Sequence, residues 1–77
     1  MLTIADKPKN ATGKESRLWD ILIEADHDII MAYKHVSAIN LRIAEGIVNE
    51  NGINPYLKSR LKEVCGRYRC KYGEIRP

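Results

Sequence analysis

Two residue spacings in the middle of the sequence could support metal or acid–base chemistry. Glu24 and His27 stand at the Glu-x-x-His spacing with which helix bundles hold iron ions. Asp26 and Asp28 flank the histidine and are candidate acid–base groups. A helix that turns its aliphatic residues toward a core, however, turns Glu24 and His27 away from it, and no further inward carboxylate completes a site. We therefore expect no metal ion here, and we expect the two aspartates to be solvated on the helix surface.

The two cysteines are the other reactive groups. Cys65 and Cys70 stand five positions apart in a segment with a helical pattern, where their side chains point in different directions. An internal disulfide would have to break that helix. A zinc site would need thiolates about two to four residues apart and a second pair of ligands. The sequence therefore predicts two reduced thiols and no cofactor.

Signatures of catalysis are missing from the sequence. It has no glycine-rich phosphate loop and no serine or cysteine with a credible base, and a chain of 77 residues leaves little room for a concave pocket. We expect neither an enzyme nor a small-molecule substrate. The apolar stretch Met1 to Ala5 is shorter than a signal-peptide core or a membrane span. Together with the cysteine usage, this predicts a cytoplasmic protein without a membrane partner.

Positive charge is concentrated toward the C-terminus. Residues 53–77 hold seven basic residues against two acidic ones, whereas residues 15–52 hold three basic against seven acidic. Cations interleaved with tyrosines are typical of a surface that binds phosphates and stacks on bases. The predicted nucleic-acid-binding residues are Lys58, Arg60, Lys62, Arg67, Tyr68, Arg69, Lys71 and Tyr72. Alternatively, these cations are only the solvated face of an amphipathic helix.

The strongest pattern in the sequence is a heptad seam, and it predicts one long helix over residues 15–49. Aliphatic and small residues alternate spacings of four and three through about four repeats. Thr12 and Glu15 have the spacing of a capping box at the start of this helix. The seam consists of Leu18, Leu22, Ala25, Ile29, Ala32, Val36, Ile39, Ile43 and Gly46. A second apolar stripe beside it consists of Ile30, Tyr33, Leu41, Ala44 and Val48.

A shorter helix follows at once. Asn54 is a favourable N-cap and Pro55 a favourable first helical residue, so helix is expected over residues 55–70. The predicted fold class is all-α: an antiparallel helical hairpin of one long and one shorter helix. It would form a single domain of residues 15–77 behind a flexible basic arm of residues 1–14.

In such a hairpin the shorter helix leaves much of the longer one uncovered. A homodimer in which two hairpins form a four-helix bundle would bury that surface. The predicted dimer or partner interface is Leu18, Trp19, Leu22, Ile29, Tyr33, Val36 and Ile39. The alternative is a break in the long helix near Asp26, after which the first segment folds back to give a three-helix monomer.

Two functions are open to such a domain. The first is a small regulatory protein that contacts nucleic acid through its basic C-terminal helix and tail. Residues 39–49 and 54–68 also permit a helix-turn-helix interpretation, but the glycine and small residue of that motif are out of register. The second is an adaptor or inhibitor that docks an exposed apolar helix face on a larger partner with an acidic surface. Trp19, Ile23 and Tyr33 would belong to that face.

Overall fold

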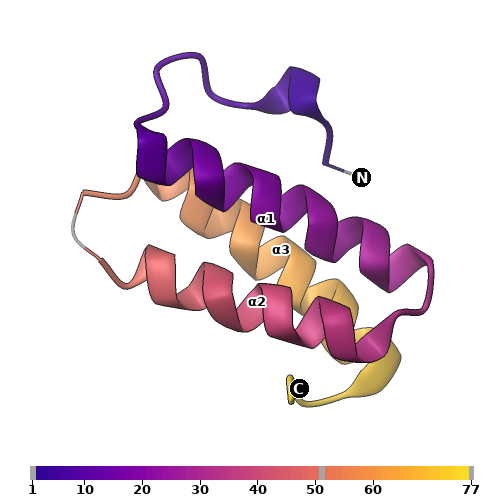
Figure 1. Cartoon of the computed structure of the whole chain (residues 1–77). Helices are drawn as coiled ribbons and strands as arrows, with labels where there is room; N and C mark the ends of the chain where they lie inside the picture. Colours follow the sequence, from indigo (N-terminus) through magenta and orange to yellow (C-terminus); the bar gives the residue numbers. More distant parts are fainter. Residues whose placement is uncertain (1, 51, 77) are drawn as a thin grey trace.

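The computed structural model describes residues 2–50 and 52–76, which fold into a small helical bundle (Figure 1). A short 3-10 turn, η1 (Ile4–Asp6), precedes three α-helices: α1 (Gly13–Ile30), α2 (Lys34–Val48) and α3 (Pro55–Tyr72). α1 and α2 run antiparallel, α3 returns behind them, and each helix packs against the other two. The predicted all-α class is confirmed, since these described residues contain no strand. Within them, no helix combines the length and the apolar character that crossing a membrane requires.

The predicted two-helix hairpin is not confirmed, because residues 2–50 and 52–76 form three α-helices instead of two. Residues 31–33 interrupt the helix that we expected over 15–49. The three-helix alternative gave the right number of helices but placed the break near Asp26, which lies inside α1. The shorter helix predicted over 55–70 is confirmed as α3. The homodimeric four-helix bundle stays a prediction, and much of the surface that it was meant to cover is already buried within one chain.

The break between α1 and α2 is a Schellman motif built without glycine. Ala32 adopts the left-handed conformation, with φ at 64°. Its amide donates to the carbonyl of Ile29 at 3.2 Å, and the amide of Tyr33 donates to the carbonyl of Asp28 at 2.8 Å. These two bonds satisfy carbonyls at the end of α1, as the motif requires. Because alanine stands where glycine is usual, the sequence carries no visible stop signal here.

Replacing Ala32 with glycine is expected to stabilise the fold by about 1 kcal/mol, since the left-handed conformation is unfavourable for a residue with a Cβ atom. Chemical denaturation followed by circular dichroism measures the change. The control is Gly46→Ala in α2, where an added Cβ would meet no atom within 4 Å. It should also stabilise the chain, by up to about 1 kcal/mol, because alanine is the better helix former. A loss of stability in Ala32→Gly, as expected within an unbroken helix, would contradict the break.

The core contains the seam residues of α1 but a different face of α2. The buried seam residues are Leu18, Leu22, Ala25 and Ile29, all at most 5% exposed. In α2 the buried positions include Leu41 and Ala44, which belong to the second stripe. The seam residues Val36, Ile39 and Ile43 are 47%, 49% and 40% exposed. Because of the turn between α1 and α2, the seam residues of α1 face the core, whereas those of α2 face away from it.

The segment before α1 is tied to the bundle at several points. The predicted capping box is confirmed: the Thr12 hydroxyl accepts from the Glu15 amide at 3.2 Å, and a Glu15 carboxylate oxygen accepts from the Thr12 amide at 3.0 Å. The other oxygen of Glu15 accepts from the amide of Asn54 at 2.8 Å, which joins the starts of α1 and α3. Hydrogen bonds from the Thr12 and Asn54 amides lower the pKa of Glu15. Leu2 is buried in the core. The division into an arm and a domain at residue 14 stays a prediction.

Candidate functional site

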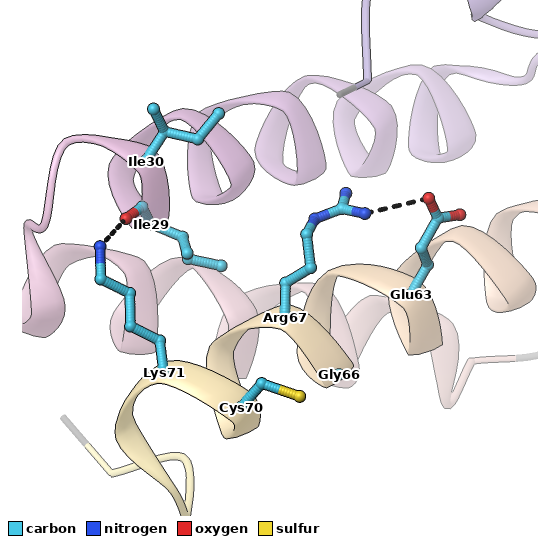
Figure 2. A pocket seen from close by; sticks show the side chains of 7 residues that line it. All are labelled: Ile29, Ile30, Glu63, Gly66, Arg67, Cys70 and Lys71. Atoms are coloured by element: carbon cyan, nitrogen blue, oxygen red, sulfur yellow. Dashed lines mark hydrogen bonds and ion pairs between the residues drawn. The ribbon is translucent and has the colours of Figure 1, made fainter.

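An open groove lies between the C-terminal end of α1 and the second half of α3 (Figure 2). It has a volume of about 680 Å³. Its lining residues are Ile29 and Ile30 of α1 and Glu63, Gly66, Arg67, Cys70 and Lys71 of α3. We refer to it as the α1–α3 groove. We expected little room for a concave pocket in so small a fold, and this groove is shallow and open to solvent.

Gly66 lines this groove without a side chain of its own. It lies inside α3, where glycine is about 1 kcal/mol less favourable than alanine. A Cβ atom added to it would meet no atom within 4 Å, so packing within the chain does not require a glycine there. The missing side chain instead adds space to the groove.

Arg67 forms one wall of the groove and joins α3 to α1. Its Nε donates to Oδ1 of Asp26 at 2.8 Å and its Nη1 donates to Oε1 of Glu63 at 3.0 Å. Asp26 is 1% exposed and also accepts from the amide of Leu2 at 3.1 Å. Burial alone would lower the pKa of Arg67, but hydrogen bonds and charge from Glu63 and Asp26 outweigh it and raise that pKa. The remaining nitrogen, Nη2, is buried and has no acceptor among the described residues.

Lys71 forms the other end of the groove. Its Nζ donates to the carbonyl of Ile29 at 2.8 Å, at the C-terminus of α1, where a cation is favoured by the helix dipole. The same atom lies 5.4 Å from the centre of the Tyr72 ring. Figure 2 shows the side chains of Lys71 and Arg67 extending from α3 toward α1. In the described part of the chain, Lys71 forms no ion pair with a carboxylate.

The predicted nucleic-acid-binding residues divide into two groups. Five of them contact the chain itself: Arg60, Arg67, Tyr68, Lys71 and Tyr72. Arg60 pairs with Glu63 at 2.8 Å and lies over the Tyr56 ring, while Tyr68 is fully buried. The other three, Lys58, Lys62 and Arg69, are exposed, and no ion pair of theirs occurs within residues 2–50 and 52–76. Only these three form a free cationic row on α3.

The predicted interface residues divide in the same way. The α1 members, Leu18, Trp19, Leu22 and Ile29, are buried in the core of the single chain. Tyr33, Val36 and Ile39 are exposed at the start of α2. Ile43 and Gly46 extend this row on the same side of the helix, at seam spacing. We call Val36, Ile39, Ile43 and Gly46 the outer face of α2. Our interface prediction omitted Ile43, although the seam contained it.

Exposed apolar side chains are concentrated in the segment of the sequence that contains this face. In the described part of the chain, seven large apolar residues are exposed, and six of them lie between residues 30 and 43. They are Ile30, Met31, Tyr33, Val36, Ile39 and Ile43. Next to the outer face, His35 and Arg42 are exposed, so its flank is basic or neutral.

The aspartates flanking His27 are not the solvated groups that we expected. Asp26 and Asp28 are 1% and 3% exposed. Asp28 accepts from Nδ2 of Asn40 at 3.0 Å and so joins α1 to α2, while Asp26 pairs with Arg67. Glu24 and His27 are exposed on α1. The helical periodicity correctly predicted that Glu24 and His27 face away from the core. No sequence signal showed that the two aspartates have partners in other helices.

The two cysteines are unpaired, as predicted. Cys65 is buried between the helices and Cys70 is exposed in the α1–α3 groove. Burial raises the pKa of the Cys65 thiol, the charge of Glu45 adds to the increase, and Arg69 opposes it.

Comparison of the chain with protein-family models, with curated proteins and with solved structures found no match.

Proposed function

We propose that this chain is a non-enzymatic protein-binding module, and that the outer face of α2 docks in an apolar groove with an acidic rim on a partner protein. The observation that carries this proposal is the row of half-exposed Val36, Ile39 and Ile43 on the side of α2 that does not face the core. A helix with apolar residues at i, i+3 and i+7 is the usual ligand of such a groove.

The residues of this outer face lower the stability of α2 when the chain is isolated. Isoleucine and valine are weaker helix formers than the lysine, glutamate or glutamine that usually occupy solvated positions. Gly46 adds a further unfavourable residue, and a Cβ atom there would meet nothing within 4 Å. Within residues 2–50 and 52–76, packing covers only about half of each aliphatic side chain of this face. A partner helix or groove would bury the remaining aliphatic surface and could approach α2 closely at the glycine.

Charge favours an acidic partner over a second copy of this chain. His35 and Arg42 flank the face, and neither forms an ion pair with an acidic residue of the described segments. In a two-fold antiparallel pair of α2 helices, Arg42 would approach Arg42 of the partner, and like charges there disfavour association. An acidic rim would instead attract this flank and speed association.

The free cationic row of α3 supports a second candidate function, nucleic-acid binding. Lys58, Lys62 and Arg69 are spaced so that they share one side of the helix. Each could neutralise a phosphate without breaking an internal contact. This row has three members instead of the eight residues that the sequence predicted, and it lacks a free tyrosine beside it.

Two variants distinguish these functions. Ile39→Gln combined with Ile43→Gln should lower the free energy of unfolding by no more than about 1 kcal/mol per site, because both side chains are already about half exposed. In extract of the native cell, the wild-type chain should elute from a sizing column in a complex much larger than its own 8.8 kDa. We expect the double variant to elute as the free chain.

The matched variant replaces Lys58, Lys62 and Arg69 with glutamine. It should elute with the wild-type complex if the outer face of α2 is the contact surface. If this variant loses the complex while the double variant keeps it, and if nuclease treatment also releases the wild-type chain, the nucleic-acid candidate is correct and the protein-binding proposal is wrong.

A further inference from the structure

We infer that the α1–α3 groove is a second binding site, and that it takes a small amphiphilic carboxylate whose carboxyl group contacts Lys71 and whose apolar chain lies on Ile29, Ile30 and Gly66. The groove is separate from the outer face of α2, so this inference does not depend on the proposed function. It rests on the charge, the shape and the apolar floor of the groove.

The positive end of the groove is set by Lys71. An ammonium group has three hydrogens to donate, and the carbonyl of Ile29 accepts only one of them. Within the described ranges no carboxylate neutralises this cation. The remaining donors can therefore bind a carboxylate that enters the groove, in a charge-assisted hydrogen bond.

Arg67, one turn before Lys71 on α3, also contributes positive charge to the groove. Both carboxylates near it are already engaged: Asp26 holds Nε, and Glu63 holds Nη1 while pairing with Arg60. Its Nη2 has no acceptor in the described part of the protein. Glu63 at the far end of the groove would repel a carboxylate, which favours a ligand whose charged group lies toward Lys71 and whose apolar end lies toward Glu63.

The size and floor of the groove fit one small ligand. Its volume of about 680 Å³ is in the range of sites for small molecules, about 300–1,000 Å³. From Glu63 to Lys71 the helix extends about 12 Å, a length comparable with that of an extended decanoate. Ile30 is 56% exposed, and Gly66 adds no side chain, so an acyl chain can cover an apolar surface that is otherwise solvated.

The test is a titration of the full chain with decanoate, followed by amide chemical shifts in NMR spectra. We expect saturable changes at residues 29, 30, 66, 70 and 71. Decanol, which has no charge, should bind about tenfold more weakly, and Lys71→Gln should weaken decanoate binding by a similar factor. Glutamine keeps a terminal N–H donor, one bond closer to the backbone than the lysine ammonium, so this variant chiefly removes the charge.

Gly66→Leu should place a side chain in the path of the acyl chain and abolish the saturable changes. The matched control is Gly13→Leu, which makes the same substitution at an open position at the start of α1, outside both proposed sites, and should leave decanoate binding unchanged. The inference is overturned if decanoate and decanol bind equally, if Gly66→Leu binds like the wild type, or if the shift changes do not saturate and occur equally at Val36, Ile39 and Ile43.

Discussion

Replacing Trp19 with alanine is expected to lower the free energy of unfolding by about 3–5 kcal/mol, which is close to the whole stability of a domain of this size. The Trp19 side chain is fully buried. Its Nε1 donates to the carbonyl of Thr3 at 3.1 Å, and its ring stacks on Tyr56 with the ring centres 6.0 Å apart. The variant should therefore be largely unfolded at room temperature, as measured by circular dichroism and urea denaturation.

The matched control is Tyr33→Ala. Tyr33 is 50% exposed and stands before α2 without a side-chain capping bond. Its loss should change the free energy of unfolding by no more than about 0.5 kcal/mol. We predicted from the sequence that both aromatic residues serve a partner interface. Equal losses of stability in the two variants would show that Trp19 is not the central core residue of this bundle.

Replacing Asp26 with alanine should have the second-largest effect, a loss of about 2 kcal/mol. The substitution leaves Nε of Arg67 and the amide of Leu2 without their acceptor. The effect stays below that of a fully buried pair because the Arg67 side chain is 36% exposed, and water can solvate its guanidinium group in part.

Two comparisons make the Asp26 prediction specific. Asp20 lies on the same helix, is 62% exposed and contacts Lys7 at 3.4 Å, so Asp20→Ala should lower stability by less than about 1 kcal/mol. In a double-mutant cycle, Asp26→Ala and Arg67→Ala should be non-additive by about 1 kcal/mol or more. Additive effects would mean that the ion pair between α1 and α3 does not stabilise the fold.

Local sequence signals predicted where α1 and α3 begin, but no local signal separated α2 from α1. The capping box of Thr12 and Glu15 and the Asn54-Pro55 start of α3 are local patterns, and both are confirmed. The end of α1 depends on a left-handed alanine, which is held by the two hydrogen bonds of the Schellman motif and by the packing of α1 against α2. A periodic pattern cannot show such a turn, because the seam spacing continues through it.

The candidate sites were predictable only in part, for a related reason. Sequence patterns place a residue on a face of its own helix, but its partners lie on other helices. Arg67 and Lys71 were therefore grouped with Lys58 as a basic surface, although Asp26 and the carbonyl of Ile29, far away in the sequence, engage them. Val36 and Ile39 were predicted in the interface because they belong to the seam, and they are exposed because the seam leaves the core at the break.

The most direct test of the proposed protein contact is photo-crosslinking from single positions in the living native cell. A photoreactive amino acid would replace Ile43 on the outer face of α2, Lys62 in the cationic row of α3, or Glu24 on the exposed side of α1. We predict one discrete protein adduct from position 43, lost in Ile39→Gln and weakened in Arg42→Glu, and none from position 24. An adduct with the mass of two chains would identify a second copy as the occupant and contradict the acidic partner. Nucleic-acid adducts from position 62, with none from position 43, would contradict the protein-binding function itself.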